Sequence, residues 1–324
     1  MKARYIPLLL SALLFITCEK EIEFSGSKAE PKITLNGVLM ADSTVSIHLS
    51  KSRFFLDSSL GFPDIIDAEV TLYSGSKTAQ MKHVGNGNYT ADYIPQNGEA
   101  IELKVKVSGF PSVHSSAIIP EKPAVGEVTT ETSTSEYPLQ NWDYSGIIDI
   151  GTSVNQTIKF KIPITDNGNE QNFYRLVVLK TQHYGEGVSR SYLSYFSDPV
   201  FEANSTEDFT GISDQSNRYN IFTDILFNGT TYQLTFSDNN LKEINLLPEY
   251  EDATYQYVIP DRVVYNIQVQ QLSHDYYMYL KTRNANFNSD DNPFMEPIQI
   301  FSNIENGTGI LGGAAITRRI VEVD

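Results

Sequence analysis

The sequence is poor in cysteine, in basic side chains and in long apolar runs, and each shortage excludes a class of protein. One Cys among 324 residues excludes an internal disulfide framework and a multi-cysteine metal site. Lys and Arg number 24 against 40 Asp and Glu, which gives a formal net charge of -16. Sequence-independent binding of nucleic acid requires clustered basic side chains, so we expect no nucleic-acid partner. No internal apolar run reaches about 18 residues, the length that a membrane-spanning helix needs.

Familiar catalytic motifs are lacking as well. The five histidines are scattered, and neither the H-E-x-x-H zinc motif nor the G-x-S-x-G nucleophile turn occurs. We therefore name no catalytic residue, expect no cofactor and favour a non-enzymatic protein.

Side chains that favour β-strands are abundant. The chain has 19 Tyr and 17 Phe, and its hydrophobic content of 40% is enough to bury a core. Between residues 31 and 121, short runs of alternating apolar and polar residues are separated by turn sequences such as Gly85-Asn86-Gly87-Asn88. This spacing predicts about seven strands and an immunoglobulin-like β-sandwich over 31–121.

A longer motif within this stretch runs from Gly87-Asn88-Tyr89 through Pro95 and Gly98 to an alternating strand at 103–107 and Gly109-Phe110. It resembles the carboxypeptidase-regulatory-like sandwich module. The tyrosine of that module packs into the core beside a turn, so the resemblance implies a role in stability and none in chemistry.

The second half of the chain also favours strands. Pro120 and Pro123 end the first domain, because closely spaced prolines do not continue a strand ladder. Residues 124–324 predict a larger β-rich domain, either a sandwich or barrel-like, with one short helix that Ser273 caps. The mostly-β fold class covers both domains. We expect the glycine-rich segment 306–313 to form tight turns between the final strands.

Aromatic side chains on and after the helix are the candidates for a ligand groove. Tyr276 and Tyr279 share the apolar face of the helix and are expected to anchor it to the sheet. Tyr277 lies on another face and is expected to be exposed. The speculative ligand-binding residues are therefore Tyr277, Phe287 and Phe294.

Acidic loops offer weak candidates for a calcium site. Asp166 opens the sequence Asp-Asn-Gly-Asn-Glu, and Asp290 and Asp291 lie in a second acidic loop. Both loops place oxygen ligands at close spacing, but neither has the twelve-residue calcium pattern. Asp-Asn-Gly between two strands is also what a hairpin turn requires, so we favour a turn at Asp166 and an ordinary loop at Asp290 and Asp291.

The N-terminus has the pattern of a lipoprotein signal peptide. Residues 1–17 combine Lys2 and Arg4 with an apolar stretch, and the lone cysteine, Cys18, follows at once. This arrangement resembles a bacterial lipobox, in which the cysteine becomes palmitoylated and then carries the mature chain. An ordinary secretory signal is the alternative. Residues 18–30 are expected to form an acidic tether, and the opening Glu19-Lys20-Glu21-Ile22-Glu23 resembles a surface-export tag or is a solvated linker.

The last third of the chain carries the sequences of a known family. They are SDPVF at 197–201, FTDILFNG at 222–229, YYMYLK at 276–281, NPFMEP at 292–297 and SNIENGTGILGG at 302–313. With Asn36-Gly37 and the opening at Cys18, they resemble a Bacteroidota lipoprotein family known as domain of unknown function 4249.

This resemblance implies a lipid-anchored protein at the outer membrane, exposed on the cell surface, beside a TonB-dependent receptor. The expected function is that of a non-enzymatic accessory in nutrient capture or uptake, attached to the membrane through Cys18. Two alternatives stay open: a surface hydrolase of glycans or peptides, and an adhesin or matrix protein.

Overall fold

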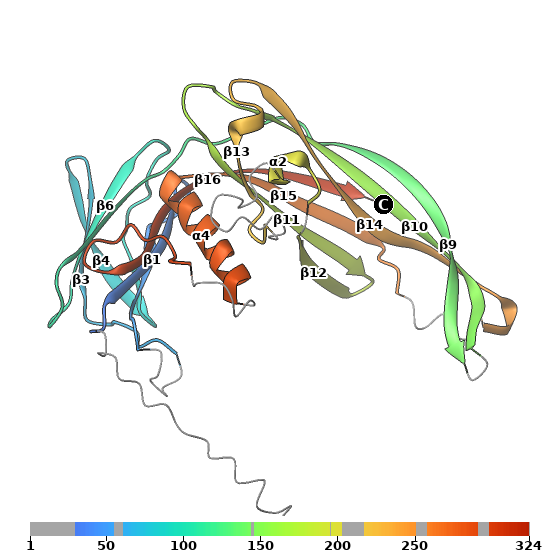
Figure 1. Ribbon diagram of the computed structural model, residues 1–324, viewed down its shortest axis with the longest axis horizontal. Helices are drawn as coiled ribbons and strands as arrows, with labels where there is room; N and C mark the ends of the chain where they lie inside the picture. Colours follow the sequence, from blue (N-terminus) through green and yellow to red (C-terminus); the bar gives the residue numbers. More distant parts are fainter. Residues whose placement is uncertain are drawn as a thin grey trace, which may run out of the picture.

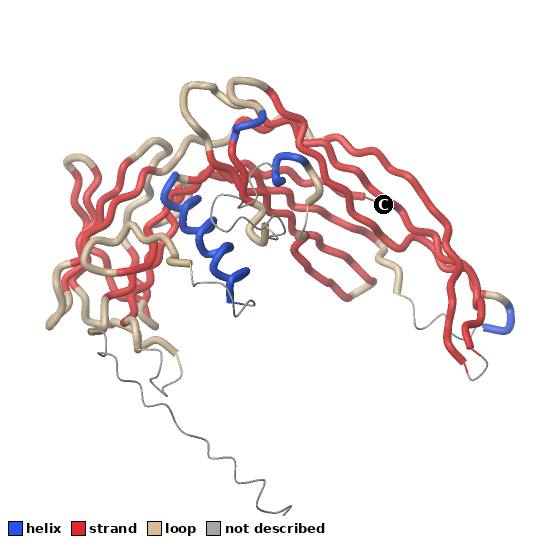
Figure 2. The backbone as a smooth tube through the Cα atoms, in the orientation of Figure 1, coloured by secondary structure: helices blue, strands red, loops and turns tan. Residues whose placement is uncertain are grey.

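A computed structural model describes residues 30–54, 61–143, 146–194, 196–202, 217–250, 258–290 and 298–323. The signal peptide, Cys18, Phe294 and Asp291 lie outside these residues. Of the helices within them, none has the length and apolar character needed to cross a membrane. The prediction of a mostly-β fold is confirmed, as the prevalence of strands in Figure 2 makes plain.

The first part of the chain forms a β-sandwich. Its strands are β1 (Ile33–Met40), β2 (Ser46–Lys51), β3 (Glu69–Ser74), β4 (Lys77–Gly85), β5 (Asn88–Thr90), β6 (Ala100–Lys106) and β7 (Val113–Ile118). Alternate residues of these strands point inward, and Leu35, Leu49, Leu72 and Leu103 are completely buried. The motif tyrosine, Tyr89, is buried among them as expected, and its hydroxyl donates to the carbonyl of Ile65 at 3.1 Å.

The remaining elements form a second sandwich and one long helix. They are β8 (Ala124–Val125), β9 (Thr129–Asp143), β10 (Gly146–Thr165), β11 (Phe173–Tyr184), β12 (Gly187–Leu193), α2 (Pro199–Glu202), β13 (Ile221–Thr223), the 3-10 turn η2 (Asp224–Leu226), β14 (Thr231–Leu246), β15 (Arg262–Leu272), α4 (His274–Asp290) and β16 (Thr308–Val323). One sheet contains β14, β10, β9 and β8, and it packs against β11 and β15. The rings of Phe160 and Phe236 stack at 4.5 Å within this core, and Tyr265 packs on Phe160 at 4.7 Å.

The last strand of the chain joins the two sandwiches. β16 runs parallel to β1 from Thr308 to Ala314, and antiparallel to β15 from Ala314 to Val323. One sheet therefore continues from β12 through β11, β15, β16 and β1 into the first sandwich. Ile304 and Leu311, near the end of the chain, belong to the core of the first sandwich. Figure 1 shows the resulting arch, with α4 on its inner side where the sandwiches meet.

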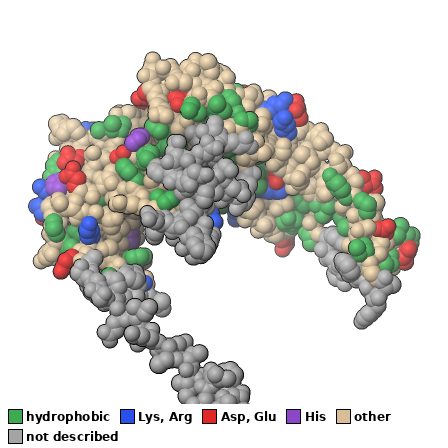
Figure 3. Space-filling model, viewed as in Figure 1, with side chains coloured by type: hydrophobic (Ala, Val, Ile, Leu, Met, Phe, Trp, Pro, Cys, Tyr) green, Lys and Arg blue, Asp and Glu red, His purple; other side chains and the backbone are tan. Residues whose placement is uncertain are grey.

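The long strands β9, β10 and β14 extend to the far end of the arch, away from the first sandwich (Figure 1). Exposed hydrophobic side chains gather near that end (Figure 3), and Tyr137, Ile147 and Leu247 are among them. The helix α4 lies at the other end of the second sandwich, against β16. The two hollows described below flank this helix.

Candidate functional site

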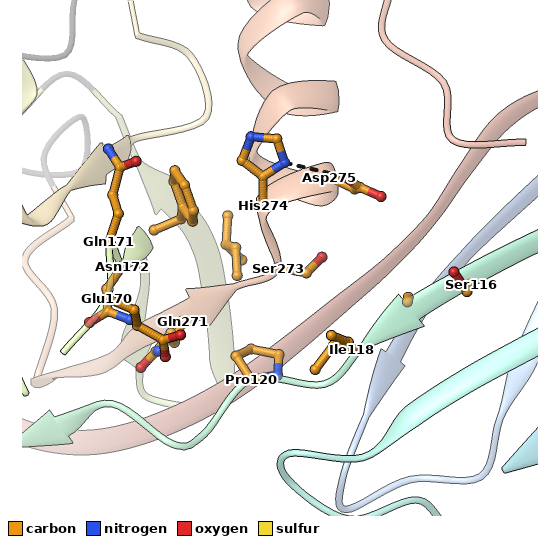
Figure 4. Close-up of a pocket in the computed structure, with 13 residues that line it drawn as sticks. Ser116, Ile118, Pro120, Glu170, Gln171, Asn172, Gln271, Ser273, His274 and Asp275 are labelled. Carbon is orange, nitrogen blue, oxygen red and sulfur yellow. Dashed lines mark hydrogen bonds and ion pairs between the residues drawn. The ribbon is translucent and has the colours of Figure 1, made fainter. Parts of the chain in front are cut away.

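The smaller hollow, which we call the junction pocket, lies at the start of α4. It has a volume of about 370 Å³ and is lined by residues 116–118 and 120, 170–173 and 271–275 (Figure 4). It thus lies where the end of β7, the segment before β11 and the link between β15 and α4 come together.

Ser273 and its neighbours give this pocket its shape. The Ser273 hydroxyl accepts hydrogen bonds from the backbone N–H groups of Gly313 at 3.0 Å and Tyr276 at 3.4 Å, so Ser273 caps the helix as the sequence predicts. The next residue, His274, lies 3.2 Å from the carboxylate of Asp275. Asn172 is 3% exposed, and its side-chain oxygen has no hydrogen-bond partner among the described residues.

The larger hollow, which we call the arginine cleft, runs along the side of α4. Its volume is about 810 Å³, and its walls come from β1, β11, α4 and β16. The residues that give the cleft its chemistry are Asn36, Arg175, Tyr219, Tyr276, Tyr279 and Arg283. Ligand sites in proteins commonly have volumes of about 300–1,000 Å³, a range that includes this cleft.

Two arginines of the cleft are held in place by neutral groups. The Nε–H of Arg175 donates to the backbone oxygen of Tyr219 at 3.1 Å, and its guanidinium lies 5.9 Å from the centre of the Tyr219 ring. Arg283 donates from Nη1 to the hydroxyl of Tyr279 at 3.3 Å and lies 5.9 Å from that ring. Contacts of this kind position a guanidinium without cancelling its charge.

A third arginine adjoins the cleft. The guanidinium of Arg218 lies 5.4 Å from the centre of the Phe287 ring, and that of Arg283 lies 5.8 Å from the same ring. Phe287 is 39% exposed, so this candidate from the sequence does lie at the surface.

The phenols of Tyr219 and Tyr276 remain neutral near physiological pH. Burial raises the pKa of Tyr219, while the nearby charges of Arg283, Arg175 and Arg218 act to lower it. Burial also raises the pKa of Tyr276. Because both shifts are upward from about 10, neither phenolate forms to offset the arginine charges.

The tyrosines of α4, the other aromatic candidates that the structure describes, do not all have the environments that the sequence predicts. The expectation that Tyr277 is exposed is wrong: it is 4% exposed and packs with Leu272, Leu280 and Ala314. The helix packs against β16 and also contacts β11 and β13, so more than one of its faces is covered. Tyr276 and Tyr279, which we expect to anchor the helix, border the arginine cleft as well.

Asp166 is the one acidic calcium candidate whose side chain the structure describes, and it acts as a turn residue. The carboxylate of Asp166 accepts hydrogen bonds from the hydroxyl of Tyr174 at 2.9 Å and from the N–H groups of Gly168 and Gly229 at 2.8 and 2.9 Å. The side chain of Asp290, like all of Asp291, lies outside the described residues. Across the described ranges, no three His, Cys, Asp or Glu side chains are grouped so as to hold a metal ion.

No sequence pattern indicates that Arg175, Tyr219 and Arg283 form a group. They come from β11, from the loop before β13 and from α4, and no motif joins them. Only the tertiary structure brings them together.

These features define a mostly-β protein with two sandwiches joined by a shared strand and flanked by one long helix. The family model described as "Domain of unknown function (DUF4249)" matches residues 19–320, so the chain belongs to that family, and the predicted membership of domain of unknown function 4249 is confirmed. No curated protein matches the chain.

Among solved structures, the chain is similar to the partial N-terminal region of an enterococcal surface protein. The two share 8% sequence identity over 77% of this chain and 93% of that one, with a TM-score of 0.15. Similarity this low carries no argument about function.

Proposed function

We propose that the protein is a non-enzymatic binding protein of the outer-membrane surface, anchored through lipidated Cys18 and working beside a TonB-dependent receptor in nutrient capture. The observation that carries the proposal is the arginine cleft. It combines a volume of about 810 Å³ with aromatic, amide and guanidinium groups, which is the composition of a site for a small polar molecule.

The walls of the cleft are suited to binding. Thr34, Asn36 and Thr308 lie on the adjacent parallel strands β1 and β16, and Tyr276 and Arg283 lie on a helix that packs against β16. Regular elements hold their side chains in place more firmly than loops do, so a ligand loses less affinity to ordering them.

The anchoring part of the proposal rests on the sequence. Cys18 is the lone cysteine of the chain and directly follows an apolar stretch with a basic start. Each buried methylene of an acyl chain contributes about 0.8 kcal/mol, so several chains together hold a protein stably at a membrane surface.

Labelling and co-purification test this proposal. Cells that express the protein are labelled with a clickable palmitate analogue, and the native lipoprotein is then purified in mild detergent. We expect wild type to be labelled and to recover a receptor barrel, and Cys18→Ser to lose the label and leave the membrane fraction. An unlabelled wild-type chain contradicts the anchor, and a labelled chain that never recovers a barrel contradicts the receptor role.

One observation favours the alternative of a surface hydrolase. The junction pocket brings Glu170, His274 and Asp275 to one hollow, and such side chains perform acid and base catalysis in many hydrolases. Turnover of a glycan or peptide panel by wild type, abolished in Asp275→Asn and Glu170→Gln, would establish this alternative. Turnover that both variants retain would mean that the active site lies outside the junction pocket.

A further inference from the structure

The arginine cleft concentrates positive charge in a strongly acidic protein. The chain has a formal net charge of -16, yet Arg175 lies 5.9 Å from the centre of the Tyr219 ring, and the neighbouring Arg218 shares the Phe287 ring with Arg283, at 5.4 and 5.8 Å. Three positive charges so close together repel one another unless an anion is present.

Within the part of the chain that the structure describes, no carboxylate lies within 4.0 Å of these three arginines. Other basic side chains of the protein do have such partners. Arg262 lies 3.3 Å from Glu322, and Lys180 lies 2.7 Å from Asp238. Among the described residues, the charges of these three guanidinium groups therefore have no carboxylate beside them to neutralise them.

The arginines also keep donors for a ligand. A guanidinium has five N–H donors. Arg175 uses its Nε–H for the carbonyl of Tyr219. Arg283 uses Nη1 for Tyr279. The remaining N–H groups match the planar, two-point geometry with which arginine binds a carboxylate or a sulfate.

The part of the lining that β1 and β16 contribute has no charged side chain and combines polar with apolar groups. It includes Thr34 and Asn36 of β1 and Thr308 of β16, whose hydroxyl and amide groups both donate and accept hydrogen bonds. Aromatic rings, among them Tyr219 and Tyr279, border the remaining sides. Uncharged polar groups bind ligand hydroxyls, and aromatic faces pack against ring carbons.

We propose that the arginine cleft binds an acidic saccharide, with its carboxylate or sulfate group paired to Arg175 and Arg283 and its ring packed against the tyrosines. The inference rests on the proposed function, since it names the class of nutrient that the cleft captures. Both kinds of ligand carry an oxyanion on a sugar ring, and the experiment distinguishes a carboxylate from a sulfate.

The test measures binding to the full chain by calorimetry with four probes. They are a galacturonic acid trimer, a sulfated galactose trimer, a neutral galactose trimer and inorganic sulfate. We expect at least one acidic trimer to bind at least tenfold more tightly than the neutral trimer and than inorganic sulfate. The acidic trimer that binds identifies the source of the oxyanion.

Variants assign the binding to the cleft. Arg283→Gln removes a charge-assisted contact and is expected to weaken binding of the acidic trimer about tenfold or more. Arg283→Lys keeps the charge but loses the two-point geometry, so an intermediate loss is expected. Arg190→Gln is the matched control: it removes the same charge from an exposed position on β12, outside the cleft, and should leave binding unchanged. Thermal unfolding of each variant checks that the fold is intact.

Salt provides an independent measurement. Raising the ionic strength from about 0.05 to 0.5 M should weaken binding to wild type clearly and to Arg283→Gln much less, because salt screens the charge pair.

Four results would overturn the inference. They are failure of both acidic trimers to bind, equal binding of acidic and neutral trimers, binding of inorganic sulfate as tight as that of the trimers, and equal losses in Arg190→Gln and Arg283→Gln. None of them affects whether the lipoprotein is labelled or recovers a receptor barrel, so failure here is distinguishable from failure of the proposed function.

Discussion

Gly312 lies directly against the ring of Tyr276. A β-carbon added to Gly312 would meet Cβ and Cγ of Tyr276 at 2.7 Å, closer than such atoms approach in proteins. The bare backbone of β16 at this point lets the tyrosine, and with it the first turn of α4, pack directly on the sheet. This contact sets one wall of the arginine cleft.

We predict that Gly312→Ala destabilises the protein by about 1–3 kcal/mol, the usual cost of inserting a methyl group into a packed site. Urea unfolding measures this. The loss should be smaller when Tyr276→Ala is already present, because two of the three crowding atoms are then gone. Ile320→Ala, at a position that is 73% exposed on the same strand, should change stability by less than about 0.5 kcal/mol. An equal cost of Gly312→Ala in both backgrounds would mean that the ring is not what confines Gly312.

The same glycine shows where the sequence misleads. Residues 306–313 were expected to form tight turns, but Gly312 and Gly313 lie within β16. A β-carbon at Gly313 would meet the carbonyl oxygen of Ile118 at 2.1 Å. Both glycines serve close approach between elements, and a single sequence does not distinguish that need from the need for a turn.

Local sequence patterns correctly predicted those parts of the fold that interactions between neighbouring residues determine. Alternation predicted strands such as β1 and β6, Ser273 was identified as the helix cap, and the burial of Tyr89 followed from its motif. The parallel pairing of β1 with β16 could not be predicted in this way. It joins the two ends of the chain, and neither strand carries a signal of its partner.

The arginine cleft was missed for the same reason. Arg175, Tyr219 and Arg283 are each unremarkable in their own segments, and their chemistry appears only when β11, the loop before β13 and α4 meet. Phe287 could be named from the sequence because a single aromatic side chain near a helix end is by itself a candidate for ligand contact.

Asp198 fastens the segment around α2 to β14. It is 3% exposed, and its carboxylate accepts hydrogen bonds from the hydroxyl of Tyr232 at 2.6 Å, the N–H of Thr235 at 2.8 Å and the N–H of Val200 at 3.0 Å. We predict that Asp198→Ala lowers the free energy of unfolding by about 2–4 kcal/mol, because several buried donors lose their acceptor. Denaturant unfolding measures the loss. Asp92→Ala, at an exposed position, is the control and should cost less than about 0.5 kcal/mol. Similar costs for the two variants would contradict the fastening role.

Lys180 and Asp238 form a largely buried ion pair between β11 and β14. Their charged atoms are 2.7 Å apart, and Asp238 also accepts a hydrogen bond from the hydroxyl of Tyr265 at 2.7 Å. We predict that Lys180→Met destabilises the protein by about 3–5 kcal/mol, because it leaves a buried carboxylate without its cation. Adding Asp238→Leu to that variant should restore part of the loss.

The control for this pair is Lys106→Met, which breaks the exposed pair with Glu69 and should cost no more than about 1 kcal/mol. Chemical unfolding of all the variants provides the comparison. A double variant less stable than Lys180→Met would show that the carboxylate contributes without its lysine.

Glu99 makes the stability of the first sandwich depend on pH. Burial acts to raise the pKa of its carboxyl group. Hydrogen bonds from the hydroxyls of Ser74 and Tyr93 and from the N–H of Gln96, the last at 2.7 Å, together with the nearby charge of Lys77 outweigh burial and hold the pKa below the ordinary value of 4.5. Since the folded-state pKa lies below the unfolded one, the carboxylate stabilises the fold above about pH 4.5, and that stabilisation is lost as the pH falls through the folded-state pKa.

We therefore predict that Glu99→Gln is less stable than wild type at pH 7 and that the difference shrinks as the pH is lowered below 4.5. Unfolding free energies measured by denaturant at pH 7 and at several acidic values give both quantities. Ser74→Ala removes one of the donors, so in that background Glu99→Gln should cost less at pH 7 and the pH dependence of the cost should be weaker. A difference between wild type and Glu99→Gln that stays constant from pH 7 into the acidic range would mean that the carboxylate charge does not stabilise the sandwich, and that the hydrogen bonds serve equally well with a neutral side chain.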